Sequence, residues 1–170
     1  MILLSASLPT RTSNLHDWPM DTWDNYLFID ETKPYTRNLI ATDHQTYSLL
    51  LLCWNPGQES PIHNHPCDGC WLQVLEGMIR EVRYDKNLQE TSNEVYSSRD
   101  NVTYITDQDG YHKVGHASPT GQPAMTLHVY APPFTKCKVW ASRDKKGGID
   151  TNGEVAFSKN YSEFGRVLEE

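Results

Sequence analysis

Residues 57–77 read GQESPIHNHPCDGCWLQVLEG, and this stretch decides the fold. Two glycines, Gly57 and Gly77, enclose a pair of histidines, His63 and His65, that are two positions apart. Side chains two residues apart in a strand point to the same face of a sheet. The two imidazoles can therefore bind one metal ion from one face of a strand.

The chain around this stretch has the pattern of a β protein. From about Tyr47 onward, short runs rich in Val, Leu, Tyr and Thr alternate with turn residues. These runs predict strands at 47–54, 70–75, 78–84, 94–98, 102–106, 112–117, 124–131, 137–142 and 153–158. Evenly spaced strands with little helix favour a sandwich or a small barrel. Residues 1–19 look irregular, and a short helix is predicted over 20–28.

Length and charge narrow the class of protein. The 170 residues predict a single domain over 1–170, with 1–30 as an irregular or helical segment that packs outside the barrel. The 15 basic and 22 acidic residues give a net charge of -7 without a basic stripe, so no nucleic-acid partner is expected. The longest apolar run, 49–54, is far shorter than the roughly 20 residues of a membrane span. The N-terminus lacks the basic region of a secretory signal, so we expect a cytoplasmic protein with reduced thiols.

The strand predicted at 124–131 carries two different faces. Thr126, His128 and Tyr130 share one face, and apolar side chains at 125, 127 and 129 share the other. In a small barrel both faces can be covered, whereas in an open sheet the polar stripe would face solvent. The pattern alone leaves both interpretations open.

The cysteines do not form a recognisable zinc site. Cys67 and Cys70 make one C-x-x-C, but a four-cysteine site needs a second, and the sequence has none. Cys53 and Cys137 are expected to be buried, because a free cysteine packs as a small apolar side chain.

The spacing in 57–77 resembles the first cupin motif, G-x5-H-x-H-x4-E-x6-G, with Cys70 in place of the usual Glu. His112 follows Gly110 and fits the metal-binding histidine of the second cupin motif, although His116 replaces the Asn that usually comes four residues later. The resemblance implies a mostly β fold, the cupin double-stranded β-helix or jelly-roll barrel, with a metal inside and a short N-terminal helical segment.

A site of three histidines without a carboxylate limits the chemistry. Non-haem iron oxygenases more often use two His and one carboxylate. Three neutral imidazoles keep the full charge of a divalent metal, so such a site should favour an anionic ligand such as a thiolate. Zinc also accepts three His plus water, which leaves a zinc- or nickel-dependent isomerase or hydrolase open, as well as a cupin that only binds a small molecule. A zinc hydrolase would want a general base, and Glu59 is expected to be a solvated loop carboxylate instead.

Together these residues resemble the cysteine dioxygenase family, iron enzymes that oxidise cysteine to cysteine sulfinic acid. The resemblance extends from about Asp17 to Gly165. It is carried by Cys70 and by YTRNL at 35–39, LCW at 52–54, HNH at 63–65, GYH at 110–112 and LHVYAPPF at 127–134. The spacing between these blocks also matches the family.

The resemblance implies a metal and a substrate site. Fe(II), the expected cofactor, would be bound by three histidines: His63, His65 and His112. Arg37 would pair with the substrate carboxylate, for which its planar fork is well suited. Tyr35 would assist Arg37, and Trp54 would lie behind them in the same pocket.

The resemblance also implies catalytic residues on the strand at 124–131. Cys70 and Tyr130 would be joined by a thioether crosslink, which acts as an internal cofactor, and His128 would orient the Tyr130 phenol. Thr126 stands where the family usually has Ser; since a hydroxyl is preserved, a relay from Thr126 through His128 to Tyr130 is expected to survive.

The implied partners are small molecules, L-cysteine and O2, in cysteine catabolism and the supply of taurine and sulfate. A monomer with no nucleic-acid or membrane partner is expected. The rival within thiol dioxygenases is 3-mercaptopropionate dioxygenase, whose members generally lack the crosslink Cys and carry Gln in place of Arg37. Both Cys70 and Arg37 therefore favour cysteine as the substrate.

Overall fold

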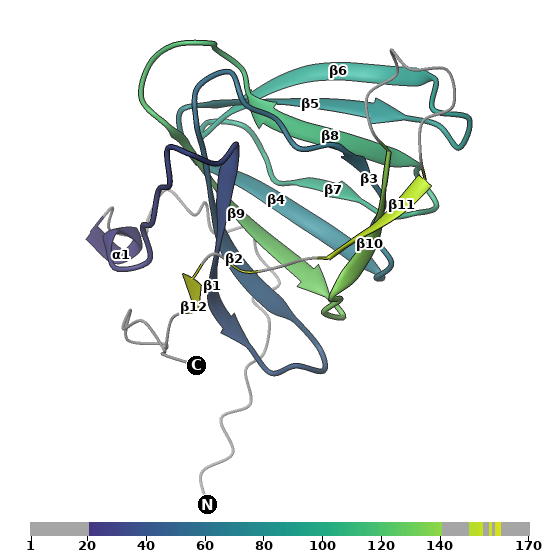
Figure 1. Ribbon diagram of the computed structural model, residues 1–170, viewed down its shortest axis with the longest axis horizontal. Coiled ribbons are helices and arrows are strands. Elements are labelled where there is room, and N and C mark those ends of the chain that lie inside the picture. The colour runs from purple at the N-terminus through teal and green to yellow at the C-terminus, as the bar shows by residue number, and fades with distance from the viewer. Residues whose placement is uncertain (1–20, 141–149, 155–156, 158, 161–170) are drawn as a thin grey trace, which may run out of the picture.

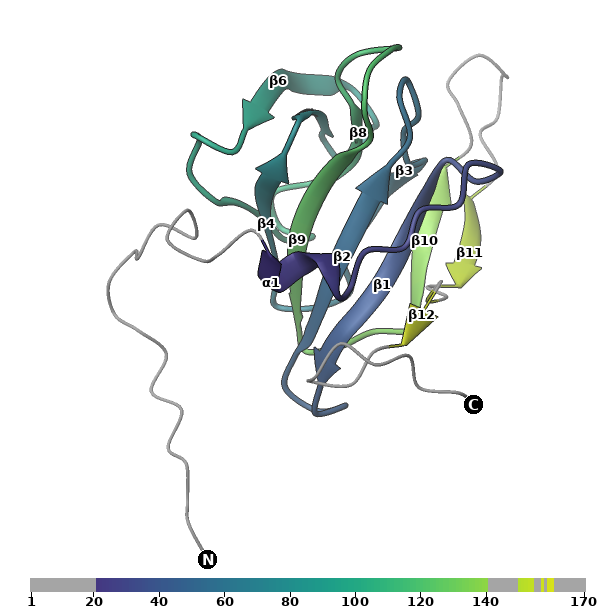
Figure 2. The same cartoon turned by 90° about the vertical axis from the view of Figure 1, so that its left-hand side faces the viewer.

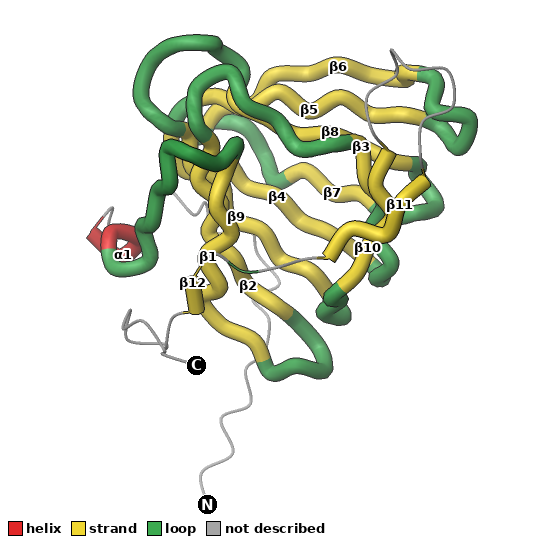
Figure 3. Tube along the Cα trace, viewed as in Figure 1, coloured by secondary structure: helices red, strands yellow, loops and turns green. Residues whose placement is uncertain are grey.

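A computed structural model of the chain describes residues 21–140, 150–154, 157 and 159–160, and most of them lie in strands (Figure 3). The elements are α1 (Asp21–Asp24), β1 (Tyr35–Thr42), β2 (Ser48–Trp54), β3 (Ile62–His63), β4 (Gly69–Glu76), β5 (Met78–Tyr84), β6 (Glu90–Ser97), β7 (Thr103–Ile105), β8 (Tyr111–His116), β9 (Ala124–Ala131), β10 (Lys136–Trp140), β11 (Asp150–Glu154) and β12 (Lys159–Asn160).

The strands form two six-stranded sheets that face each other (Figure 1). One sheet has the order β12-β1-β2-β9-β4-β7 and the other β11-β10-β3-β8-β5-β6. Neighbours that are distant in sequence, such as β2 and β9, pair antiparallel. This crossed order is that of a jelly-roll barrel, so the cupin fold expected from the motif spacing is confirmed.

The apolar core fills the space between the sheets. Leu50, Leu52 and Trp54 alternate along β2 and pack against Ile79 of β5 and Val114 of β8, all almost completely buried. Since β5 and β8 belong to the opposite sheet, these contacts close the barrel. The hydrophobic effect of such burial is the main term that holds the two sheets together.

The other face of β2 is buried as well, under the N-terminal segment. Leu51 and Cys53 pack against Trp23 of α1 and Tyr26, which follows it. Figure 2 shows α1 in front of the sheet that contains β2 and β9. Because both faces are covered, the run Ser48–Trp54 is a continuous apolar stretch with one partly exposed residue rather than an alternating pattern.

The helix predicted over 20–28 is wrong in its extent, because α1 ends at Asp24. Residues after it use their carbonyl groups elsewhere: those of Tyr26 and Phe28 accept hydrogen bonds from the Asn38 side-chain amide, and that of Phe28 also accepts one from the Thr36 hydroxyl. These bonds fasten the segment to β1 in an irregular conformation. Among the described residues, no helix is long and apolar enough to cross a membrane.

The observed strands differ from the predicted ones mainly at the polar strands β1 and β6 and toward the C-terminal end. β1 was not predicted, because its first half is polar on both faces: Tyr35 and Arg37 lie on one, Thr36 and Asn38 on the other. The two-residue strands β3 and β12 were not predicted either. β6 begins at Glu90 rather than at 94, and β11 covers Asp150–Glu154 rather than 153–158. The predicted strand at 137–142 is seen as Lys136–Trp140, and positions 1–20, 141–142, 155–156 and 158 lie outside the described residues.

Candidate metal centre and active site

Three histidines converge inside the barrel from β3, β8 and the loop after β3. His63 ends β3 and lies directly opposite His112 of β8 in the strand register. The ring centroids of His63, His65 and His112 are 4.6–4.9 Å apart. Their possible ligand nitrogens all lie within 4.8 Å of one another. One ion can therefore reach all three rings at once, as the H-x-H spacing predicted for the first pair.

The hydrogen bonds of these rings leave nitrogen atoms free for a metal. His63 Nδ1 lies 3.0 Å from the Pro61 carbonyl oxygen, which can only accept, so this nitrogen carries the hydrogen and Nε2 carries the lone pair. Both ring nitrogens of His65 are buried and have no hydrogen-bond partner among the described residues. An unpaired buried nitrogen is costly. A bound divalent cation would satisfy it, so these residues fit a metal ion.

The three rings are neutral, which is the form that binds metals. Burial lowers the pKa of His63 to about 4. Burial also lowers the pKa values of His65 and His112 well below the ordinary value for histidine. Neutral imidazoles suit iron, zinc, copper or nickel, so the donor set fits a transition metal.

The H-x-H segment is held by Asp107, which lies between the strands predicted at 102–106 and 112–117. Asp107 accepts a 2.6 Å hydrogen bond from the backbone N–H of His65 and a 2.7 Å bond from the Asn64 side-chain amide. The side-chain oxygen Oδ1 of Asn64 in turn accepts a 2.6 Å bond from the backbone N–H of Lys138 in β10. His65 lies beyond the end of β3, so these bonds and not a strand fix its position.

A second missed carboxylate lies directly behind His112. Glu81 of β5 is 2% exposed, and its Oε1 lies 2.6 Å from His112 Nδ1. Its other oxygen accepts a 3.1 Å bond from Arg83, which also donates to the Tyr104 carbonyl oxygen at 3.0 Å. Nothing in the sequence indicated this contact. Glu81 takes an inward position of the strand at 78–84, where an apolar residue is usual.

The polar stripe of β9 faces the barrel interior, so its solvent-facing interpretation is wrong. Thr126, His128 and Tyr130 are all buried. Trp54 Nε1 donates to the Thr126 hydroxyl at 2.8 Å, and that hydroxyl lies 2.9 Å from His128 Nε2. His128 Nδ1 lies 3.3 Å from the Tyr130 hydroxyl.

This chain of bonds sets the direction of each hydrogen. Thr126 accepts from Trp54 and can donate its own hydrogen to His128 Nε2, an arrangement in which Nε2 carries the lone pair. Burial lowers the pKa of His128 to about 3, so the ring is neutral and its one hydrogen lies on Nδ1. That hydrogen points at the Tyr130 oxygen, which leaves the phenol hydrogen free for another group in the barrel.

Cys70 and Tyr130 are direct partners in the register of β4 and β9. Directly opposed residues of antiparallel strands have Cβ atoms about 4.5–5.5 Å apart, so the thiol and the phenol ring meet. The Tyr130 ring is stacked 6.2 Å from that of His65. Burial raises the pKa values of both the Cys70 thiol and the Tyr130 phenol well above their ordinary values. The pair is therefore uncharged and lies beside the histidine cluster.

The residues expected at the substrate carboxylate lie together on β1 and β2. Arg37 donates a 2.8 Å hydrogen bond to the Tyr35 hydroxyl, and the Tyr35 ring stacks on Trp54 with centroids 4.5 Å apart. The Arg37 charge lies near enough to His63 and Tyr130 to lower the pKa of each, although burial dominates both shifts. Arg37 thus gives the barrel interior a cation on the side opposite the β5 carboxylate.

The remaining candidates have structural surroundings. Cys53 and Cys137 are buried, as expected. Glu59 is an exposed carboxylate paired with Lys113 at 2.7 Å, which agrees with its assignment as a loop residue. His116 bonds to the Gln122 carbonyl oxygen and to the backbone N–H of Ser118.

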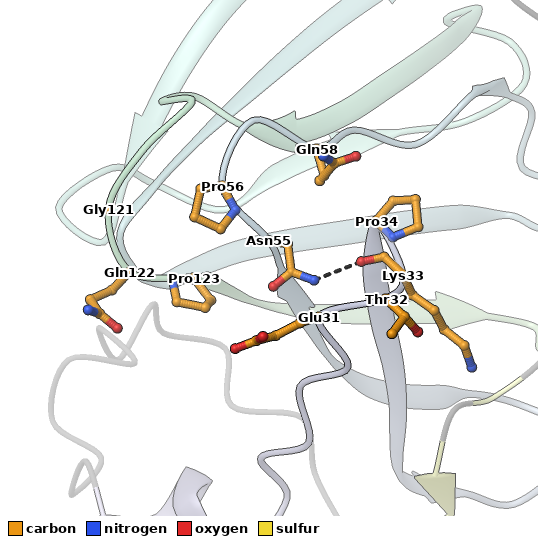
Figure 4. A pocket seen from close by; sticks show the side chains of 10 residues that line it. All are labelled: Glu31, Thr32, Lys33, Pro34, Asn55, Pro56, Gln58, Gly121, Gln122 and Pro123. Atoms are coloured by element: carbon orange, nitrogen blue, oxygen red, sulfur yellow. Dashed lines mark hydrogen bonds between the residues drawn. The ribbon is translucent and has the colours of Figure 1, made fainter.

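A surface pocket lies apart from these residues (Figure 4). It is lined by three loop segments around 31–34, 55–58 and 121–123. The Asn55 side chain within it donates a 2.7 Å bond to the Lys33 carbonyl oxygen and is occupied in holding two of these segments together. None of the predicted site residues lines this pocket, so it plays no part in the assignment below.

Solved structures share the barrel at low sequence identity. An RmlC-like cupin protein from Ralstonia eutropha superposes with a TM-score of 0.51 at 17% identity, over 75% of this chain and 71% of that one. A protein with a double-stranded β-helix domain from Klebsiella pneumoniae gives 0.53 at 16%, over 70% of this chain and 94% of that one. These likenesses show the cupin barrel fold, and inside this barrel His63, His65 and His112 form a cluster that can hold a metal ion.

The family follows from sequence comparison. The pattern of the family described as Cysteine dioxygenase type I matches residues 7–143. Cysteine dioxygenase type 1 of Rattus norvegicus is 33% identical over 167 residues, which cover 95% of this chain and 77% of the relative. The Homo sapiens protein of the same name is 35% identical over 152 residues, 84% of this chain and 70% of the relative. The chain belongs to the cysteine dioxygenase type I family, and membership together with the histidine cluster supports a thiol dioxygenase with a metal site.

Proposed function

We propose that this protein uses Fe(II) at His63, His65 and His112 to oxidise L-cysteine with O2 to cysteine sulfinic acid. The observation that carries the proposal is the surroundings of the histidine cluster. Cys70 of β4 and Tyr130 of β9, the two residues of the proposed crosslink, lie beside it. The cation Arg37 of β1 shares the same interior. Neither a zinc hydrolase nor a simple binding module would need Cys70, Tyr130 and Arg37 beside the histidine cluster.

Arg37 binds and orients the substrate. Its guanidinium can hold a carboxylate bidentately, and the Tyr35 hydroxyl, already bonded to it, limits the rotamers it can adopt. A carboxylate held there directs the thiol and amine of a small amino acid toward the histidines. Such positioning of two reactants is a large part of many rate enhancements.

When bound, iron supplies the redox chemistry and deprotonates a coordinating thiol. The chain contributes the Tyr130 phenol, whose hydrogen is free because His128 donates to its oxygen. This hydrogen can stabilise negative charge that develops on the reacting ligands. Trp54 and Thr126 hold His128 in the required tautomer.

A thioether between Cys70 and Tyr130 would lock the phenol in this position. Its formation breaks the S–H bond of Cys70 and one C–H bond of the Tyr130 ring and joins the sulfur to that ring carbon, while the two electrons and two protons released reduce one O2 to H2O2. The register of β4 and β9 supports this bond, since the two residues are direct neighbours across the strands. Mass spectrometry of peptides after many turnovers should find the two residues linked with two hydrogens lost.

The decisive experiment measures O2 uptake and sulfinic acid formation by the iron-loaded protein with L-cysteine and, separately, with 3-mercaptopropionate. Turnover of cysteine in preference to 3-mercaptopropionate is expected. Arg37→Gln should raise the cysteine KM roughly 10- to 100-fold, because a hydrogen-bonded charge pair is lost, while iron binding is retained. The reverse substrate preference, or unchanged kinetics in Arg37→Gln, would remove Arg37 from the substrate site. Uptake of no O2 with either thiol would reject the dioxygenase assignment.

A further inference from the structure

The three proposed metal ligands are histidines, and none is a carboxylate. A buried carboxylate, that of Glu81, nevertheless lies directly behind one of them, His112. In the register of β5 and β8, Arg83 lies opposite His112 and Glu81 lies opposite Val114. Glu81 is therefore the diagonal neighbour of His112 on the inner face of the sheet. The 2.6 Å between Glu81 Oε1 and His112 Nδ1 is the short separation of a charge-assisted hydrogen bond.

We infer that Glu81 is a positioning residue of the metal centre, which fixes the tautomer of His112 and adds negative charge behind this ligand. The inference rests on the proposed metal site. A carboxylate that accepts from Nδ1–H leaves the lone pair on Nε2, which is then the nitrogen available to a metal ion. The same bond stops the ring from rotating about its axis.

The three ligands are then unequal. His63 donates its Nδ1 hydrogen to a neutral carbonyl oxygen, and neither ring nitrogen of His65 has a hydrogen-bond partner among the residues that the structure describes. Among the described residues, the ring of His112 is the one of the three imidazoles that bonds to a carboxylate. A carboxylate partner makes an imidazole a stronger electron donor. His112 should therefore be the strongest of the three ligands, and the centre carries less net positive charge than its ligand set suggests.

Arg83 keeps Glu81 in this orientation. It bonds the carboxylate oxygen that does not face His112, so Oε1 alone remains for the ligand. Arg83 also donates to the Tyr104 carbonyl oxygen, and Tyr104 belongs to β7 of the opposite sheet. The carboxylate is thus fixed from both sheets, as a positioning residue must be if its bond is to keep a single geometry.

The test measures Co(II) affinity and the visible absorption spectrum of the Co(II) protein for the wild type and two variants. Glu81→Gln keeps an acceptor of the same shape without the charge, and Glu81→Ala removes both. Loss of such a partner typically weakens metal binding about 10–100-fold. We expect Glu81→Gln to lie between wild type and Glu81→Ala in affinity, with shifted Co(II) bands in both variants. Far-ultraviolet circular dichroism checks that each variant is folded.

Glu59→Gln is the matched control. Glu59 is an exposed carboxylate that bonds Lys113, the residue next to His112, but it lies outside the barrel. This variant should bind Co(II) like the wild type. If Glu81→Gln also had wild-type affinity and spectrum, the inference would be overturned.

Failure of this inference can be told apart from failure of the proposed function. Cysteine turnover by the wild type, with Co(II) binding that does not respond to Glu81→Gln, would reject the role of Glu81 and keep the dioxygenase. Co(II) binding that responds to Glu81→Gln, in a protein that does not turn over cysteine, would keep the role of Glu81 and reject the dioxygenase. Absence of Co(II) binding by the wild type would reject both.

Discussion

Thr126 connects two buried side chains that would otherwise lack partners. Its hydroxyl accepts from Trp54 Nε1 and donates to His128 Nε2, and the residue itself has no exposed surface. A single oxygen atom therefore sets the tautomer of His128 and the direction of the Tyr130 phenol.

Thr126→Val should disrupt this relay without changing the shape of the core much. It leaves the Trp54 N–H and His128 Nε2 unpaired in a buried place, which costs about 1–3 kcal/mol for each unsatisfied group. We expect a lower free energy of unfolding in urea and a fall in kcat that exceeds the change in the cysteine KM. Thr126→Ser is the matched control, because it keeps the hydroxyl. Equal kcat values in the two variants would show that the hydroxyl does not matter for turnover.

At the level of residues, sequence spacing predicted the site where ligands lie close together in the chain or in a recurring motif. His63 and His65 are two residues apart, and this spacing alone indicated a shared face. Glu81 and Asp107 could not be found in this way. Each contacts a site residue that lies far away in sequence, and only the strand register and the loop conformation bring them together.

Among the elements, the segment after β3 is held least by regular structure. β3 ends at His63. Beyond it, Asn64 still bonds to the backbone of Lys138 in the neighbouring strand β10, whereas the backbone N–H of His65 bonds to Asp107. One carboxylate thus connects the H-x-H segment to the turn before β8, the strand that supplies His112.

Asp107→Ala should loosen this segment and with it the metal site. Two hydrogen bonds to a charged group are lost, so we expect unfolding in urea to require about 2–3 kcal/mol less than in the wild type. Co(II) affinity should fall as well, because His65 loses its support. Asp107 and Asp68 line one surface pocket, which is distinct from that of Figure 4. Asp68→Ala removes an exposed carboxylate from this pocket and should change neither quantity. Wild-type Co(II) affinity in Asp107→Ala would mean that His65 is placed by other contacts.

The predictability of the strands follows their apolar pattern. β2 and β9 were predicted because apolar or β-branched runs are frequent in strands buried on both faces. β1 carries Tyr35 and Arg37 inward and bonds the N-terminal segment outward, so its sequence shows no apolar alternation. The strand that supplies the proposed substrate cation was therefore missed by the apolar pattern.

For the molecule as a whole, a polar site is enclosed in an apolar barrel, and this arrangement makes stability depend on pH. His128 is buried and neutral in the folded protein, where its pKa is lowered to about 3. In the unfolded chain a histidine has a pKa near 6.5. Between these two values the unfolded state binds a proton that the folded state does not, so stability falls as pH falls from about 6.5 toward 3.

The metal-free protein should show this dependence in urea titrations at pH 7, 6 and 5. A single buried histidine contributes a slope of up to about 1.4 kcal/mol per pH unit in this range. His128→Gln should reduce the slope by about that amount, although its stability at pH 7 will also be lower because the bonds to Thr126 and Tyr130 change. His44→Gln alters an exposed histidine and should keep the wild-type slope. An unchanged slope in His128→Gln would mean that His128 takes up its proton without unfolding, and that the relay from Trp54 to Tyr130 tolerates a charged imidazole.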